Sequence, residues 1–233
     1  PIKLFRNVSN EQGFEKAKEI FANDYYVSPE KLDLAVMTEE NERKIIELSK
    51  PDSFSLYVGV PFCPSRCSYC SFVMSSIERA KKLVDPYADL LCEEIKLTAE
   101  IANKLGLRLE TVYFGGGTPT TLSAEQLSKV IGTVNGNFNM SACREFTVEA
   151  GRPDTVTEAK IQALSEHNID RISINPQTMK EETLHIIGRN HTNRQIYDAF
   201  SLARKYGLPV INCDLIAGLP EETPEDFKDT VNK

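Results

Sequence analysis

The sequence has no long hydrophobic segment and no excess of positive charge. No apolar run approaches the roughly 20 residues that a membrane-spanning helix requires, so we expect no membrane span. The 233 residues include 27 lysines and arginines against 34 aspartates and glutamates, giving a formal net charge of −7. General nucleic-acid binders normally present a basic surface, and this charge balance therefore argues against a nucleic-acid partner.

A secretory signal and a disulfide framework are also missing. The first residues, PIKLFRN, contain no apolar core of a signal peptide. Three of the six cysteines are clustered. The other three are scattered and are expected to be small buried hydrophobic side chains: Cys92, Cys143 and Cys213. We therefore expect a cytoplasmic protein with reduced thiols.

The two ends of the sequence indicate a longer chain. The first residue is a proline, and the last residues, TPEDFKDTVNK, begin a helical pattern that stops within about two turns. We expect further residues beyond Lys233 that complete the core.

Two polar stretches before Pro51 have helical spacing. Residues 11–23 and 29–49 repeat apolar side chains at helical intervals, with charged residues between them. Pro51 interrupts this pattern. The sequence therefore predicts a helical N-terminal section over residues 1–50 and a separate core over residues 51–233.

Beyond Pro51, short β-rich runs alternate with helical segments. The expected strands are 56–60, 111–114, 145–150, 171–175 and 209–218. The expected helices are 79–105, 123–134, 157–167, 180–187, 193–206 and one from residue 224. Ser123, with Gln126 three residues later, and Thr157 are typical N-caps. Five successive β–α units with apolar strands predict an α/β fold, in which helices cover parallel strands.

The helix expected at 79–105 carries an apolar stripe. Because an amphipathic helix turns its apolar side to the core, we expect this stripe to be buried. Its members are Leu83, Tyr87, Leu90, Leu91, Ile95, Leu97 and Ile101.

A doubly wound sheet and a barrel both fit this alternation. Cys63, residues 115–118, Glu149, Gln177 and Asp214 each lie at or just past the end of an expected strand. In a barrel these ends converge on one mouth, whereas in an open sheet only the switch point forms a crevice. The positions of these residues favour a barrel.

Residues 61–70, PFCPSRCSYC, contain three cysteines at C-x3-C-x2-C spacing: Cys63, Cys67 and Cys70. Thiolates bind zinc or iron–sulfur clusters. Three thiolates on a four-iron cluster leave one iron free to bind something other than protein. The alternative is a zinc site that takes its fourth ligand from a distant Cys or His.

The stretch YFGGGTPT places three glycines directly after an expected strand, at residues 115–117. Glycines allow the backbone to come close to a ligand, and exposed N–H and C=O groups can bind a carboxylate or an ammonium group. The alternative is a tight turn with Thr118 as a cap and Pro119 early in a helix.

Further polar residues follow the expected strands. Glu149 can bind a ribose hydroxyl or an ammonium group, and the alternative is an ion pair with Arg152 or Arg171. Asp214 interrupts an apolar strand, where an unpartnered carboxylate is unfavourable. Gln177 and Arg189 are candidates of the same kind. The three histidines are expected to be solvated: His167, His185 and His191.

The motifs PFCPSRCSYC and YFGGGTPT together resemble those of the radical S-adenosylmethionine (SAM) superfamily. More narrowly, the chain resembles the oxygen-independent coproporphyrinogen III oxidase family of haem biosynthesis. Supporting stretches run in the family's order between Tyr57 and Thr223: VEAGRPD, RISINPQ, IGRNHT and DLIAGLPEET.

The resemblance implies an α/β partial (β/α)6 TIM-like radical SAM barrel, with a [4Fe–4S] cluster on Cys63, Cys67 and Cys70. The amino and carboxylate groups of S-adenosyl-L-methionine would bind the free iron, and the reduced cluster would split its sulfonium. The resulting radical would abstract hydrogen from a porphyrinogen-type substrate, whose propionate would lose CO2 and leave a vinyl group. An external electron donor such as flavodoxin or ferredoxin is also implied.

The resemblance also assigns cofactor-binding residues. Tyr57 would lie near the cluster, Tyr69 would contact the adenine, and Gly116, Gly117 and Thr118 would meet the methionine end. The other positions that match cofactor contacts are Glu149, Gln177, Arg189 and Asp214.

Phe72 departs from the family pattern, because the characterised bacterial oxidases carry a further cysteine at that place. The related haem-chaperone branch also lacks it. A haem chaperone, or another reaction on the same scaffold, is therefore the alternative to the oxidase.

Overall fold

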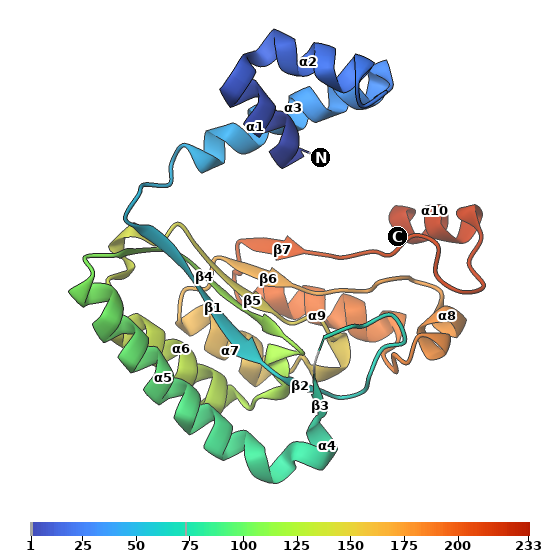
Figure 1. The fold of residues 1–233 in the computed structure, drawn as a ribbon. Helices are drawn as coiled ribbons and strands as arrows, with labels where there is room; N and C mark the ends of the chain where they lie inside the picture. Colours follow the sequence, from blue (N-terminus) through green and yellow to red (C-terminus); the bar gives the residue numbers. More distant parts are fainter. Residues whose placement is uncertain (1, 73) are drawn as a thin grey trace. The chain divides into compact units, whose positions relative to one another are not determined.

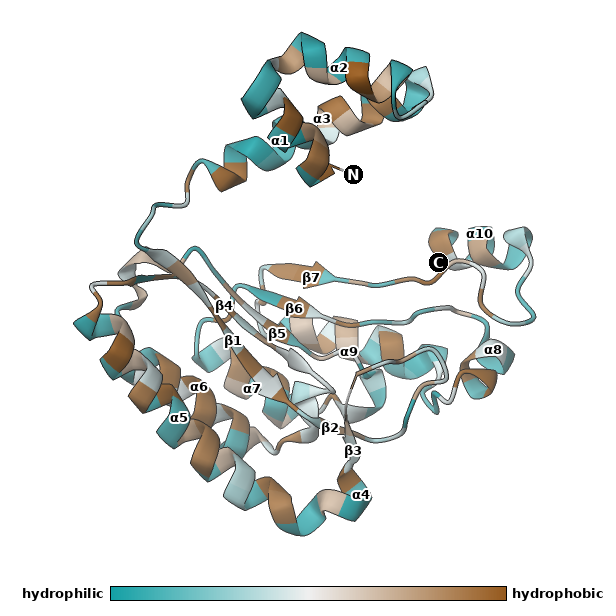
Figure 2. Ribbon diagram, viewed as in Figure 1, coloured by the Kyte–Doolittle hydropathy of each residue, from teal (hydrophilic) through white to brown (hydrophobic). Residues whose placement is uncertain are grey.

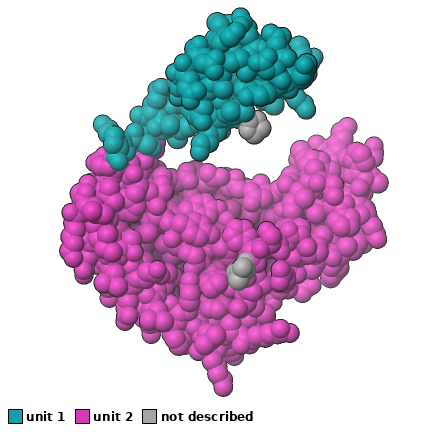
Figure 3. Space-filling model, viewed as in Figure 1, with its two compact units in different colours: residues 1–51 teal, residues 52–233 magenta. Residues whose placement is uncertain are grey.

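The computed structural model describes residues 2–72 and 74–233. Its contacts divide the chain into two compact units, one up to Pro51 and one over Asp52–Lys233 (Figure 3). Within the described residues, no helix is both long enough and apolar enough to span a bilayer.

The N-terminal unit consists of three helices, α1 (Ile2–Gln12), α2 (Phe14–Asn23) and α3 (Pro29–Ile46). Helix α1 precedes the first helix expected from the sequence. Phe5 is fully buried, and Phe14 and Phe21 meet it edge-on, with ring centroids 5.7 and 5.0 Å away. These aromatic contacts form the centre of the unit's own small core.

The second unit is built on a five-stranded parallel sheet. Its strands are β1 (Ser53–Val60), β4 (Arg108–Gly116), β5 (Glu145–Glu149), β6 (Arg171–Ser173) and β7 (Val210–Asn212). They lie side by side in chain order, β1-β4-β5-β6-β7. A doubly wound sheet reverses direction at a switch point, whereas a barrel adds each strand beside the last. The predicted parallel α/β fold is confirmed, and the strand order is that of a partial barrel.

Helices pack on one side of this sheet (Figure 1). They are α5 (Val84–Lys104), α6 (Ala124–Asn137), α7 (Glu158–Glu166) and α9 (Asn193–Lys205). The shorter elements are β2 (Phe62–Cys63), β3 (Ser75–Ser76), α4 (Ile77–Ala80), α8 (Glu181–Ile186) and α10 (Pro224–Asn232). The predicted caps are confirmed: Ser123 and Gln126 form a capping box, and Thr157 accepts from the Lys160 amide.

The strands alternate between a face turned to the helices and an open face. Val58, Phe114, Val148 and Ile172 are in register across four strands and are at most 2% exposed. On β4 the neighbouring Tyr113, on the opposite face, is 38% exposed. The helix-facing side therefore forms the main core.

Part of the apolar stripe predicted over residues 79–105, most of which forms α5, is wrong. Leu91 and Ile95 are buried and Tyr87 is partly buried, but Leu83, Leu90, Leu97 and Ile101 are exposed. The side that meets the sheet also contains small residues, namely Val84, Ala88, Cys92, Ala99 and Ala102. Small side chains let the helix approach the sheet closely, so the large leucines lie on the outer side. Figure 2 shows hydrophobic residues distributed around α5 rather than along one edge.

The scattered cysteines only partly match the expectation of burial. Cys92 is buried in the core, Cys143 is partly buried, and Cys213 is exposed. Cys213 is exposed because β7 ends at Asn212, six residues earlier than predicted, so the residues after it are no longer part of a covered strand.

Candidate functional site

The three clustered cysteines lie in the loop that follows β1, which we call the cysteine loop (residues 61–72). Their side chains line one cavity at the carboxyl end of the sheet. The cavity is also lined by Tyr69 of the cysteine loop and by residues at or after the ends of β4, β5 and β6. These are Gly117, Thr118, Glu149, Gly151, Arg152, Asn175, Gln177 and Arg189.

The structure brings most of the predicted site residues to this cavity. Those that line it are Cys63, Cys67, Cys70, Tyr69, Gly117, Thr118, Glu149, Gln177 and Arg189. Tyr57, Gly116 and Asp214 are not among the lining residues. Gly116 precedes the lining residue Gly117, and Asp214 accepts from the lining residue Asn175. Tyr57 is one step further away, since it stacks on Tyr113, which donates to the lining residue Glu149.

The three glycines at the end of β4 allow close packing within the chain itself. Gly116 has a φ of 107°, and a Cβ on Gly117 would lie 2.6 Å from the Phe62 carbonyl oxygen. The amides of Gly117 and Thr118 donate to the carbonyls of Val60 and Phe62, both at 2.8 Å. These two amides are therefore not free for a ligand, contrary to the expectation of exposed N–H groups. They fasten the end of β4 to the start of the cysteine loop.

A second anchor of the cysteine loop is the turn after α8. The Ser68 amide donates to the Ile187 carbonyl at 3.0 Å, and the Ser65 hydroxyl donates to the Gly188 carbonyl at 2.6 Å. Gly188 has a φ of 77°, and a Cβ there would lie 2.7 Å from the Arg66 carbonyl oxygen. A glycine is needed here for both its conformation and its lack of a side chain.

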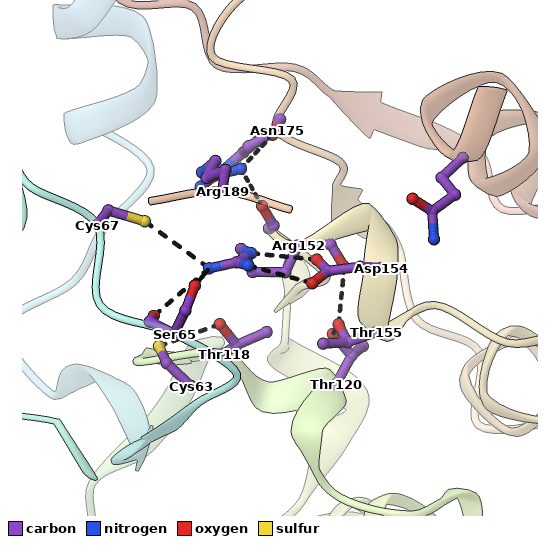
Figure 4. A network of polar contacts seen from close by, with 12 residues as sticks. Cys63, Ser65, Cys67, Thr118, Thr120, Arg152, Asp154, Thr155, Asn175 and Arg189 are labelled. Atoms are coloured by element: carbon purple, nitrogen blue, oxygen red, sulfur yellow. Dashed lines mark hydrogen bonds and ion pairs between the residues drawn. The ribbon is translucent and has the colours of Figure 1, made fainter. Parts of the chain in front are cut away.

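A third anchor is Arg152, which follows β5 and is 2% exposed (Figure 4). Its Nη1 donates to the Ser65 hydroxyl at 3.1 Å and to Cys67 Sγ at 3.8 Å. Its Nε and Nη2 donate to the two carboxylate oxygens of Asp154, each at 3.1 Å. The alternative ion pair between Arg152 and Glu149 is therefore wrong. The contact of Arg152 with the cysteine loop was not predicted from the sequence.

Arg189, in the turn after α8, is buried and also lines the cavity. Its Nη1 donates to the carbonyls of Gly151 and Asn175 at 3.0 and 2.7 Å, and its Nε donates to the Tyr69 hydroxyl at 3.1 Å. Burial raises the pKa of Tyr69 to about 12, so this phenol stays neutral. Arg189 thus presents a fixed positive charge inside the cavity.

Glu149 presents a carboxylate to the same cavity. It accepts a hydrogen bond from Tyr113, whose ring is stacked on Tyr57 with an interplanar angle of 10°. Loss of hydration is the main cause that raises the pKa of Glu149 above its ordinary value, and the Tyr113 hydrogen bond opposes it. The contact to Tyr113 could not be read from the sequence, because it joins two different strands.

Asp214 and Gln177 lie beside each other at the edge of the cavity. The Asp214 carboxylate accepts from Asn175 at 2.8 Å and from Asn212 at 2.7 Å. The sequence predicted that Asp214 interrupts an apolar strand, where an unpartnered carboxylate is unfavourable. That reason is wrong, because Asp214 is exposed and has hydrogen-bond partners. Gln177 is buried, has a φ of 67° and donates its amide to the Asp214 carbonyl at 3.0 Å. A left-handed residue other than glycine is uncommon and often marks a functional position.

The expectation of three solvated histidines is wrong for His191. His185 is exposed, and His167 is half-buried and bonded to Ser128, but His191 is only 3% exposed. Both of its ring nitrogens lack a hydrogen-bond partner. Burial, together with the charge of Arg189, lowers its pKa to about 4, so the ring is neutral.

The donor set fits an iron–sulfur cluster better than a single ion. Among the residues that the structure describes, no three of the types His, Cys, Asp and Glu are close enough to hold one metal ion. The lining residues of the cavity include no histidine and no fourth cysteine, and Cys92 is buried in the core on α5. Three soft sulfur donors around a shared space suit a cluster, three of whose irons would each take one thiolate.

Comparison with known proteins identifies the superfamily. The model of the Radical SAM superfamily matches residues 57–233. The oxygen-independent coproporphyrinogen-III oxidase-like protein HemZ of Bacillus subtilis is 37% identical, over 99% of this chain and 46% of that protein. The heme chaperone HemW of Lactococcus lactis is also 37% identical, over 80% of this chain and 46% of that protein.

A solved structure shows the same architecture. Coproporphyrinogen III oxidase (HemN) from Escherichia coli, described as a radical SAM enzyme, aligns with a TM-score of 0.69 and 28% identity. The alignment covers 82% of this chain and 44% of that one. The chain spans less than half the length of the curated relatives described above. The resemblance stated from the sequence is confirmed, and the chain belongs to the Radical SAM superfamily.

Proposed function

We propose that this chain is the core of a radical SAM oxidoreductase that acts on a porphyrinogen. The observation that carries the proposal is the meeting of Cys63, Cys67 and Cys70 with Glu149 and Arg189 in one cavity. Sulfur donors, a carboxylate and a guanidinium are the groups needed for an iron–sulfur cluster and a zwitterionic nucleotide.

The three cysteines would hold a [4Fe–4S] cluster, and the rest of the cavity would hold S-adenosyl-L-methionine. When bound, the reduced cluster supplies an electron that splits the sulfonium into a hydrogen-abstracting radical. Cys67 is buried while Cys63 and Cys70 are half-buried, so the chain would shield a bound cluster from solvent on the side of Cys67.

The cofactor-binding roles proposed for the other residues follow their positions. Arg189 and Gln177 would bind polar groups of the nucleotide, and Glu149 would accept from its ribose hydroxyls. Tyr69 would lie against the adenine. The remaining proposed contacts are Tyr57, Gly116, Gly117, Thr118 and Asp214.

We propose oxidative decarboxylation of coproporphyrinogen III propionates to vinyl groups as the reaction. Relatives named oxygen-independent coproporphyrinogen III oxidase support this choice, including those of Escherichia coli and Paracoccus denitrificans. An external one-electron donor such as flavodoxin or ferredoxin would reduce the cluster. Free thiols and an oxygen-sensitive cluster suit the reducing cytoplasm.

A haem chaperone is the second candidate. Phe72 is 58% exposed at the place where the characterised oxidases carry an additional cysteine. Relatives named heme chaperone HemW, from Lactococcus lactis and Bacillus subtilis, also match this chain. An apolar, exposed side chain beside Cys70 suits the flat face of a haem.

Turnover separates the two candidates. The full-length protein, reconstituted anaerobically with iron and sulfide, is incubated with dithionite, S-adenosyl-L-methionine and coproporphyrinogen III. Formation of 5′-deoxyadenosine together with protoporphyrinogen IX supports the oxidase. Stoichiometric haem binding without that product supports the chaperone, and zinc in place of iron contradicts both.

The cysteine assignment has its own test. Cys67→Ala should lose the cluster yet keep the fold, because the main core packs without the metal. Cys143→Ala is the matched control, since Cys143 does not line the cavity. Iron and sulfide are measured per protein, with circular dichroism to check folding. Wild-type iron content in Cys67→Ala would contradict the assignment.

A further inference from the structure

We infer that Arg152 is a positioning residue that holds the cysteine loop in place and raises the reduction potential of the cluster the loop carries. The inference rests on the proposed function in one respect, namely that the bound group is an iron–sulfur cluster. The contacts of Arg152 with the loop are independent of that identity.

Burial of the Arg152 guanidinium is unfavourable unless its N–H groups find partners, because the group loses its hydration when it leaves water. The side chains of Arg152 and Asp154 are 3% and 18% exposed. Asp154 takes one edge of the guanidinium in a bidentate pair, the strong form of this interaction. That pair would be complete on its own near the surface, yet the chain buries the arginine far enough to reach the cysteine loop.

The remaining edge of the guanidinium is directed at the cysteine loop (Figure 4). Nη1 contacts the Ser65 hydroxyl and Cys67 Sγ, and the Ser65 hydroxyl donates to the Gly188 carbonyl. Arg152 thus joins the segment after β5 to the loop and, through Ser65, to the turn after α8. Loss of this side chain would leave Ser65 and Cys67 with fewer fixed contacts.

The charge of Arg152 has a second consequence. An N–H donor next to a cysteine sulfur stabilises negative charge on that sulfur, and the effect is strong where water is excluded. Reduction by one electron adds one negative charge to a cluster, so a neighbouring cation favours the reduced form.

Asp154 provides a second test, in which the midpoint potential of the cluster should shift in the opposite direction. Its carboxylate partly neutralises Arg152, and it lies on the edge of the guanidinium away from Cys67. Removal of the Arg152 charge should make the cluster harder to reduce, whereas removal of the Asp154 charge should make it easier to reduce. If Arg152 and Asp154 had only a structural role, the two substitutions would not shift the potential in opposite directions.

The experiment is a redox titration of the full-length protein, reconstituted anaerobically, with dithionite as the one-electron reductant. The variants are Arg152→Gln, Arg152→Lys and Asp154→Asn. Arg171→Gln is the control, since Arg171 contacts Asn212 and Glu145 on the open face of the sheet. Readouts are iron and sulfide per protein, the spectrum of the reduced cluster and its midpoint potential.

In Arg152→Gln the ratio of reduced to oxidised cluster at a fixed potential should fall at least tenfold, which is about 59 mV for one electron. Arg152→Lys should shift the midpoint in the same direction by less, and Asp154→Asn should shift it the opposite way. Arg171→Gln should match the wild type. If Arg152→Gln loses its iron, the loop-holding role is supported, and the lysine and Asp154 variants test the potential.

An unchanged midpoint in an iron-replete Arg152→Gln overturns the inference, as do shifts of the same sign in Arg152→Gln and Asp154→Asn. Failure of the proposed function is distinguishable from these results. It would appear in the wild type itself, as a protein that binds no iron–sulfur cluster or ignores S-adenosyl-L-methionine, before any variant is compared.

Discussion

The two faces of the parallel sheet differ in what they contribute to the protein. Toward the helices, Val58, Phe114 and Ile172 are almost completely buried. On the open face, Tyr57 and Tyr113 are in register, and the polar side chains bond to one another. Side chains alternate along each strand, so neighbouring residues have different roles. Those facing the helices form the core, and those on the open face lie on the side of the candidate site.

The largest expected effect is on the helix-facing side. Phe114→Ala should lower the free energy of unfolding by about 3–5 kcal/mol, because it leaves a cavity where the ring was fully buried. Urea unfolding at pH 7 measures the change. A loss below about 1 kcal/mol would mean that this face does not carry the core.

Next in size is a pH effect on the site side. The folded-state pKa of His191, about 4, lies below its ordinary value of 6.5, so the folded state binds fewer protons between these values. The associated stability is fully present above pH 6.5 and is lost as the pH falls toward 4, by up to roughly 3 kcal/mol.

His191→Leu removes this titrating group, so stability should decline less steeply than in the wild type between pH 6.5 and 4. Urea unfolding across this range measures the difference. His185→Leu is the control, because His185 is exposed and should leave the slope unchanged. Parallel curves for His191→Leu and the wild type would show that the ring is hydrated.

A smaller effect is expected from Tyr113→Phe on the open face. It removes the hydrogen bond to Glu149, at a loss of about 1 kcal/mol, and should raise the pKa of that carboxyl further. Urea unfolding gives the first quantity, and the infrared carboxyl band, assigned with Glu149→Gln, gives the second. Tyr57→Phe keeps the stacked ring and should not move the band.

The smallest effect is expected from Thr111→Val, also on the open face. Its hydroxyl donates to Ser55 at 2.7 Å near solvent, and its loss should change stability by less than about 0.5 kcal/mol. The urea midpoint measures this change. A loss as large as that of Phe114→Ala would remove the distinction between the two faces.

Local features of the sequence predict much of the fold. The helix caps at Ser123 and Thr157, the β-rich runs and the spacing of the three cysteines can be recognised from residues near one another in the chain. The orientation of α5 was predicted only in part, because apolar residues surround this helix and the sheet accepts its small side chains.

Contacts between distant segments could not be predicted. Arg152 reaches Cys67, 85 residues away, and Tyr113 reaches Glu149 on the neighbouring strand. The pattern around Arg152 offers one signal in retrospect, since an arginine and an aspartate two residues apart follow a strand that ends at the cavity. That signal indicates an ion pair but not its position beside a sulfur.

The cysteine loop is synthesised long before its anchors. Ser65 and Gly188, which bond to each other, are 123 residues apart. At about 5–20 residues per second, a ribosome needs roughly 6–25 s to cover that distance. During this interval the cysteine loop lacks the contacts that Ile187, Gly188 and Arg152 make with it in the folded structure, so its thiols cannot yet be held in their final arrangement.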